Sequence, residues 1–187
     1  MLTQVIDIMI PKKMFLTKGV GVHPEKLSSF ELALRGAGIQ QFNLVHVSSI
    51  LPPHCNIVPR DKGLREMSPG QIVYCVMARN ATKEAGRQMA SSIGVAIPAD
   101  ESNYGYLSEH ASFGETANVA GDYAEDLAAE MLASTLGIDF DPDVSYNEKR
   151  EIWKIDDRIY KTRNITQSAV GHRKGKWTTV IAAAVFV

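Results

Sequence analysis

Residues 43–53 read N-L-V-H-V-S-S-I-L-P-P, an apolar run that passes through two serines and stops at two prolines. Apolar and β-branched residues of this kind are typical of a strand, so the run predicts one over Phe42–Leu51. A proline has no backbone N–H, and the pair Pro52-Pro53 therefore cannot continue a central ladder. The pattern places Ser48-Ser49 where a strand becomes a turn.

The rest of the chain shows two amphipathic helices among several strands. Apolar residues recur at spacings of three and four over residues 24–38 and 116–136, and a glycine ends each stretch. Further strands are predicted at 12–22, 71–78, 92–98, 104–113, 158–169 and 177–187, the last apolar enough to be buried on both faces. The polar stretch 139–151 is expected to be a loop. Few helices among many strands favour an α+β domain in which helices cover sheet.

Size and charge restrict the class of protein. The chain has 187 residues, of which 45% are hydrophobic, enough for a single domain over residues 1–187 with a substantial core. Its 20 basic and 21 acidic residues give a net charge of −1, so no global field favours nucleic acid or an anionic membrane. We therefore expect a small molecule as the partner.

No segment predicts secretion or a membrane span. The apolar stretch 1–10 contains Asp7 and has no basic residues before it, which makes it a poor signal peptide, and no later run is long enough to cross a bilayer. We therefore expect a cytoplasmic protein. In a reducing compartment Cys55 and Cys75 are expected to be free thiols.

The serine pair could carry out chemistry on its own backbone. A serine hydroxyl can attack the carbonyl of the preceding residue when the backbone is strained and that carbonyl is polarised, giving an ester in place of the peptide bond. β-Elimination from Ser49 would then release the upstream chain and leave a dehydroalanine that converts to an N-terminal pyruvoyl group. Taken alone, two serines near a proline are also ordinary turn composition.

Four segments in order carry a resemblance to a known family. They are G-A-G-I-Q-Q-F-N-L at 36–44, V-S-S-I-L-P-P at 47–53, S-I-G-V-A-I-P at 92–98 and G-Y-L-S-E at 105–109. With these segments the chain resembles the pyruvoyl-dependent arginine decarboxylases over residues 12–113, and more weakly beyond them. The resemblance implies an αββα sandwich, in which helices cover a mostly antiparallel pair of sheets. It also implies homotrimers, or multiples of them, with active sites between neighbours.

The resemblance further implies a reaction. Autocatalytic serinolysis between Ser48 and Ser49 would give a beta chain of residues 1–48 and an alpha chain of residues 49–187, with Ser49 converted to the covalent pyruvoyl cofactor. L-Arginine would then be decarboxylated to agmatine and carbon dioxide. Because self-cleavage does not depend on the substrate's side chain, a decarboxylase of another amino acid remains open. An unprocessed, non-catalytic homologue that binds a small molecule also remains open.

Matching positions in the resemblance assign the site residues. They are Ser49, Glu109 and Asn43 for catalysis and Glu31 for substrate binding. To the substrate-binding set we add the apolar residues Leu34 and Ile50. Ser49 would form the pyruvoyl group, and Glu109 would supply a proton to the substrate. The Glu31 carboxylate would hold the guanidinium group, which is always charged, and the two apolar residues would line the methylene stem.

The local patterns of the two glutamates allow these roles and also plainer ones. Strand alternation places Glu109 on one face with Leu107 and Ala111, where apolar neighbours favour a neutral carboxyl group suited to donating a proton. Nothing in the pattern gives Glu109 a part in the cleavage, and a solvated edge glutamate would look the same. Glu31 borders the apolar face of its helix, where a surface pair with Arg35 is an equal alternative.

Asn43 cannot reach Ser49 along a straight strand. Six residues of extended chain separate the two by about 20 Å. Either the strand bends sharply, or Asn43 serves the site of a neighbouring subunit, or it is a buried asparagine bonded to backbone.

No metal or dinucleotide site is expected. The adjacent His54 and Cys55 would point in opposite directions on extended chain, and the histidines show no zinc spacing. Gly19 and Gly21 lack the third glycine of a dinucleotide-binding loop.

Overall fold

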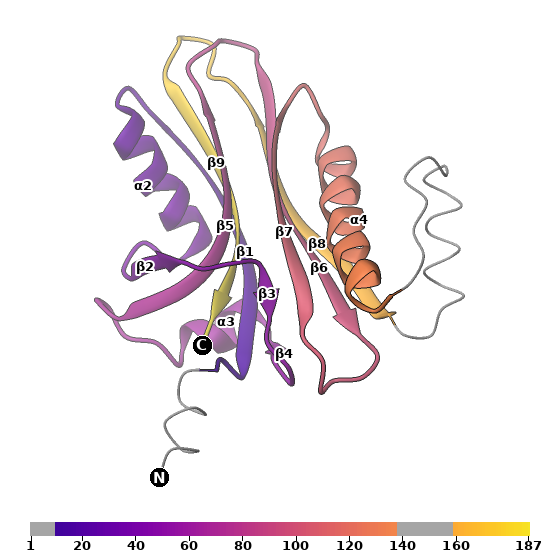
Figure 1. The fold of residues 1–187 in the computed structure, drawn as a ribbon. Coiled ribbons are helices and arrows are strands. Elements are labelled where there is room, and N and C mark those ends of the chain that lie inside the picture. Colours follow the sequence, from indigo (N-terminus) through magenta and orange to yellow (C-terminus); the bar gives the residue numbers. More distant parts are fainter. Residues whose placement is uncertain (1–9, 138–158) are drawn as a thin grey trace.

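The chain folds into four layers, with two β-sheets packed face to face between helices (Figure 1). The computed structural model describes residues 10–137 and 159–187. The α+β class and the αββα sandwich are both confirmed. Across the described residues, no helix is both long enough and apolar enough to span a membrane.

The first sheet has five strands in the described part of the chain, in the order β2-β5-β9-β1-β4. They are β1 (Lys13–His23), β2 (Asn43–His46), β4 (Asn56–Ile57), β5 (Ile72–Thr82) and β9 (Trp177–Phe186). The central strand β9 is antiparallel to β5 and β1, whereas the short outer strands β2 and β4 run parallel to their neighbours. After its first residue β9 is buried throughout, as its continuous apolar sequence predicts.

The second sheet has four strands among the described residues, in the order β3-β7-β6-β8, and all its pairings are antiparallel. They are β3 (Ile50–Leu51), β6 (Gln88–Pro98), β7 (Gly105–Phe113) and β8 (Ile159–Val170). Three of these match predicted strands, although β6 begins earlier than its apolar run indicated. The sheets bury a shared apolar layer that includes Met14, Val76, Ile93, Leu107 and Ala182.

Helices cover the two outer faces. α2 (Lys26–Ala37) and the short α3 (Arg60–Leu64) lie on the five-stranded sheet, and α4 (Ala117–Thr135) lies on the four-stranded sheet (Figure 1). α2 ends because Gly38 adopts the left-handed conformation, with φ of 79°, which a glycine takes without Cβ strain. α4 begins after Thr116, whose hydroxyl accepts a hydrogen bond from the Val119 N–H.

Glycines let the helices lie close to the sheets. A Cβ on Gly19 or Gly21 of β1 would collide with the backbone of α2. A Cβ on Gly94 of β6 would collide with the Ala124 carbonyl of α4. These positions therefore need glycine for space rather than for turn geometry.

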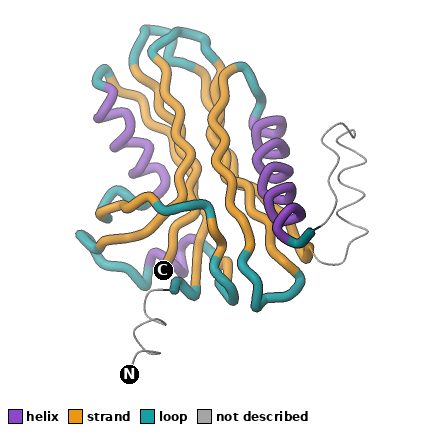
Figure 2. Tube along the Cα trace, in the orientation of Figure 1, coloured by secondary structure: helices purple, strands orange, loops and turns teal. Residues whose placement is uncertain are grey.

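The strand predicted over Phe42–Leu51 is wrong in one respect, because the run is divided between the two sheets. β2 ends at His46 in the five-stranded sheet, and the chain then crosses to the four-stranded sheet, where β3 begins at Ile50 (Figure 2). A continuous apolar run has no period that marks such a change of sheet. β4 and α3 were not predicted, and the loop expected over 139–151 lies outside the described residues.

Candidate active site

The expected cleavage site lies in the crossover that joins the two sheets. Ser48 and Ser49 fall between the end of β2 and the start of β3. Before them, the Val47 N–H donates to the Cys75 carbonyl of β5 at 3.1 Å. After them, the Leu107 N–H of β7 donates to the Ser49 carbonyl at 2.8 Å. The crossover is therefore held at both ends, by backbone bonds to different sheets.

The backbone of the crossover forms a γ-turn centred on Ser49. The Ile50 N–H donates to the Ser48 carbonyl at 2.9 Å, which is the three-residue hydrogen bond of such a turn. Among the described residues, positive φ outside glycine occurs at His54, so the turn at Ser49 is of the inverse type. The carbonyl that a cleavage reaction would attack thus carries a donor on its oxygen.

The side chains of Ser49 and Glu109 meet next to this turn. The Ser49 Oγ donates to the Glu109 Oε2 at 2.7 Å. Leu107 lies opposite Ser49 in the ladder and Glu109 lies two residues farther along β7, so the two side chains are diagonal neighbours on one face. A carboxylate at this distance can take the hydroxyl proton as a general base. The sequence pattern had given Glu109 no part in the cleavage.

The surroundings of Glu109 differ from the sequence expectation. Leu107 is fully buried, but Glu109 and Ala111, on the same face of the strand, are exposed. The apolar enclosure expected around Glu109 is therefore missing within the described part of one chain. On the other face of β7, His110 lies 2.9 Å from Glu115, and this hydrogen bond lowers the pKa of the Glu115 carboxyl group.

Asn43 is the first residue of β2, before the crossover, and Ile50 is the first residue of β3, after it. The Asn43 side-chain amide donates to the Gly70 carbonyl at 2.7 Å, so it is bonded to backbone as one alternative proposed, but the residue is exposed and not buried. The structure records this contact for Asn43 rather than one with Ser49. Ile50 follows Ser49 directly and its side chain is partly exposed.

Glu31 and Leu34 belong to α2 and lie in a different layer. The Glu31 Oε1 accepts a hydrogen bond from the Arg35 Nε at 2.6 Å, which is the helix-surface pair that the sequence allowed. Leu34 packs against the core beneath α2. The five-stranded sheet separates α2 from β7 (Figure 1). Within one chain, these two residues are therefore not brought to Glu109.

Exposed apolar side chains border the serine pair. Val45, Val47, Ile72 and Tyr74 form what we call the apolar patch. Ile50 is exposed as well, but it pairs with Tyr106, which packs against α4, so its side chain lies on the other face of the four-stranded sheet. The parallel register of β2 and β5 places Val45 beside Tyr74, and Ile72 is 63% exposed. Contiguous exposed apolar side chains are typical of a surface that another molecule covers.

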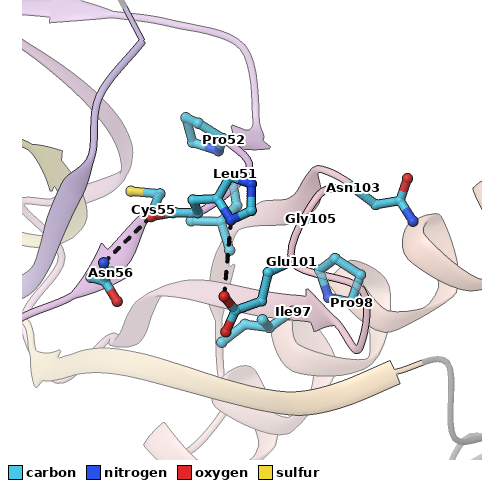
Figure 3. Close-up of a pocket in the computed structure, with 10 residues that line it drawn as sticks. Leu51, Pro52, Cys55, Asn56, Ile97, Pro98, Glu101, Asn103 and Gly105 are labelled. Carbon is cyan, nitrogen blue, oxygen red and sulfur yellow. Dashed lines mark hydrogen bonds and ion pairs between the residues drawn. The ribbon is translucent and has the colours of Figure 1, made fainter. Parts of the chain in front are cut away.

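A small pocket lies just beyond the serine pair, between the segment that follows β3 and the turn that joins β6 to β7 (Figure 3). The His54 N–H donates to the Glu101 carbonyl at 3.1 Å, and the His54 Nδ1 lies 3.9 Å from the Glu101 carboxylate. These contacts tie the segment that begins at Ser49 to the β6–β7 turn. The sequence offered no signal for the pocket, because the pairing of His54 with Glu101 is long-range.

Neither the cysteines nor the histidines form a metal site in the described residues, where no group of three His, Cys, Asp or Glu side chains is arranged around one point. Cys55 and Cys75 are free thiols, as expected. Burial raises the pKa of each thiol to about 11. Both are therefore neutral and unreactive near pH 7.

The chain is similar to known proteins over nearly its whole length. The family model of the pyruvoyl-dependent arginine decarboxylases matches residues 13–187. Pyruvoyl-dependent arginine decarboxylase 2 of Methanosarcina mazei is 59% identical over 179 residues, which cover 96% of this chain and 98% of the relative. Its counterpart in Methanosarcina acetivorans matches with the same identity and coverage. A probable pyruvoyl-dependent arginine decarboxylase of Chloroherpeton thalassium is 60% identical over 178 residues, covering 95% of this chain and 98% of the relative.

Proposed function

Because this chain belongs to the pyruvoyl-dependent arginine decarboxylase family, we propose that it decarboxylates L-arginine to agmatine and carbon dioxide with a pyruvoyl group made from its own Ser49. The family consists of decarboxylases, which are lyases, and its name specifies the pyruvoyl cofactor. The observation that carries the proposal is the 2.7 Å hydrogen bond from Ser49 to Glu109. It pairs a nucleophile with a base beside a polarised backbone carbonyl, and the residues present therefore fit a serine-derived group.

Maturation uses groups that are already in contact. Glu109 takes the proton from the Ser49 Oγ, which attacks the Ser48 carbonyl carbon. The bond from that carbon to the Ser49 nitrogen breaks, the nitrogen takes up a proton, and an ester to Oγ remains. Loss of the Ser49 α-proton then breaks the Cβ–Oγ bond, so residues 1–48 leave with a free carboxylate. One water molecule hydrolyses the dehydroalanine and releases ammonia, which leaves the pyruvoyl group at residue 49.

Turnover of arginine uses the same part of β7. When present, the pyruvoyl group supplies a ketone that takes up the α-amine and accepts the electrons left as carbon dioxide departs. The Leu107 N–H, 2.8 Å from the carbonyl oxygen of residue 49, holds that end of the alpha chain against β7. The Glu109 side chain lies on the face of β7 that meets the side chain of residue 49, and it delivers a proton to the α-carbon of the substrate. Glu109 thus acts as a base in maturation and as an acid in turnover.

The side chain of the substrate needs a second copy of the chain. Glu31 and Leu34 lie on α2, across the five-stranded sheet from Glu109, so they reach an arginine at residue 49 only from a neighbour. The apolar patch supports such an assembly, because a neighbour that covers it also shields Glu109 from water. Asn43 is in register with Ile72 of the patch and would act at the same interface. We propose a homotrimer or a multiple of it, the assembly that the family resemblance implies, because a heterologous contact forms a closed ring when its rotation allows closure.

Two measurements on one sample test the proposal. Denaturing mass spectrometry should show chains of 48 and 139 residues, the second number being 187 − 48. The same sample should release carbon dioxide from carboxyl-labelled arginine and produce agmatine. A full-length mass without agmatine would contradict the proposal. Cleaved protein that acts on a different amino acid and not on arginine would refute the substrate assignment alone.

A further inference from the structure

We propose that the backbone N–H of Ile50 is the oxyanion donor of the self-cleavage reaction. The inference rests on the proposed function, because it concerns maturation at Ser48-Ser49. It is carried by two hydrogen bonds within the crossover. The Ile50 N–H donates to the Ser48 carbonyl at 2.9 Å, and the Ser49 hydroxyl donates to Glu109 at 2.7 Å. The γ-turn therefore polarises the electrophile while β7 holds the nucleophile.

The Ile50 N–H is available because of the register of β3 on β7. The Leu107 N–H bonds to the Ser49 carbonyl, so these two residues form a hydrogen-bonded pair of the antiparallel ladder. The next pair, Ile50 with Tyr106, is then of the non-hydrogen-bonded kind. In such a pair the backbone N–H points away from the partner strand. At Ile50 it bonds back to the Ser48 carbonyl instead.

This donor favours the transition state over the starting amide. When the Ser49 Oγ bonds to the Ser48 carbonyl carbon, its proton goes to Glu109 and negative charge moves to the carbonyl oxygen. The carbon–nitrogen bond then breaks, the proton passes to the Ser49 nitrogen, and the carbonyl is restored in the ester. A hydrogen bond to an oxyanion is about twice as strong as one to a neutral carbonyl. The Ile50 N–H therefore contributes most when the charge is present, which is the condition for accelerating the step.

A side-chain donor is the other candidate for this role. Asn43 is the predicted catalytic residue with an amide donor, but its Nδ2 is bonded to the Gly70 carbonyl at 2.7 Å. The donor that the structure places on the Ser48 oxygen is the N–H of Ile50. The proposed donor is thus part of the backbone, and side-chain mutagenesis alone would not reveal it.

Replacing the N–H by an oxygen atom tests the proposal directly. The α-hydroxy analogue of isoleucine, introduced at position 50 by nonsense suppression, keeps the side chain and removes the donor. The matched control is the α-hydroxy analogue of leucine at position 51, whose N–H lies in the next hydrogen-bonded pair with Gly105. The control therefore removes a ladder bond but leaves the Ser48 carbonyl polarised. Chain cleavage is followed by mass in full-length protein, together with thermal unfolding of each variant.

We expect the ester at position 50 to slow cleavage about 10²- to 10³-fold, which is the usual effect of losing one oxyanion donor. The ester at position 51 should cleave at nearly the wild-type rate, with a similar loss of thermal stability. Cleavage of the position-50 ester at the wild-type rate would overturn the proposal, and so would equal slowing of both esters. A wild-type sample is followed in parallel. If the wild-type chain also stays intact, self-cleavage itself is refuted, and the result does not bear on the Ile50 N–H alone.

Discussion

The Ser49 hydroxyl and the Glu109 carboxylate share a hydrogen bond of 2.7 Å although 60 residues separate them along the chain. They meet because the crossover carries the chain from β2 in one sheet to β3 beside β7 in the other. The same crossover forms the γ-turn that holds the Ser48 carbonyl. The contact between Ser49 and Glu109 and the γ-turn at the Ser48 carbonyl therefore both depend on the chain crossing from one sheet to the other at this point.

Ser49→Ala removes the attacking hydroxyl and should give a folded, inactive chain of 187 residues. Denaturing mass spectrometry would show one species in place of the chains of 48 and 139 residues. Ser48→Ala is the matched control, because only the backbone carbonyl of Ser48 takes part, and it should still cleave. Cleavage of Ser49→Ala together with failure of Ser48→Ala would show that the attacking residue has been assigned wrongly.

Glu109→Gln should slow both cleavage and decarboxylation, each by about 10²- to 10⁴-fold, because an amide accepts the Ser49 hydrogen bond but cannot take or give the proton. Cleavage is followed by mass, and carbon dioxide release is measured on chains that have been cleaved. Glu101→Gln, which changes an exposed carboxylate in the β6–β7 turn, serves as the control.

The two readouts for Glu109→Gln distinguish its roles. Normal cleavage with slow decarboxylation would restrict Glu109 to turnover, as its place in the sequence alone suggested. Normal rates in both assays would remove it from the mechanism.

Glu31→Gln should weaken arginine binding by about 1.5–3 kcal/mol, the contribution of a hydrogen bond to a charged group, and leave chain cleavage intact. Arg35→Gln is the control, since it breaks the 2.6 Å surface pair but keeps the Glu31 carboxylate. Steady-state kinetics with arginine compare the two variants. An unchanged KM for Glu31→Gln would mean that the residue serves only as the partner of Arg35.

Gly94→Ala should destabilise the fold by about 1–3 kcal/mol or more, because its Cβ would meet the Ala124 carbonyl and push α4 off the sheet. Gly36→Ala is the control, since a Cβ there has its nearest neighbour at 3.4 Å, an ordinary contact, and lies within a helix that favours alanine. Urea unfolding of the two variants measures the difference. Equal stability would mean that α4 is not held at the distance seen here.

The two thiols should make stability fall at alkaline pH. Burial raises the pKa of Cys55 and Cys75 from 9.0 to about 11, so the unfolded chain loses these protons first as the pH rises. Their contribution to stability is complete below pH 9 and is lost as the pH approaches about 11. Urea midpoints at alkaline pH should therefore fall less for the double variant Cys55→Ala, Cys75→Ala than for wild type. Equal falls would assign the pH dependence to other groups.

The sequence alone predicted most of the helices and strands, because each depends on a local pattern of apolar residues. Gly38 ends α2 and Thr116 begins α4, each through hydrogen bonds to residues only a few positions away in the chain. The ordered segments around Ser49 likewise identified the family, because they are a property of the chain itself. The serine pair was predicted to be the reactive position on the same basis.

Tertiary structure decided which groups meet at that position. The apolar run over Phe42–Leu51 could not show that its two halves join different sheets, since strand pairing depends on partners far away in the chain. That pairing places the Glu109 carboxylate on the Ser49 hydroxyl and frees the Ile50 N–H for the Ser48 carbonyl. It also leaves Glu31 on the far side of a sheet from Glu109, because a helix covers only the face on which its apolar side packs.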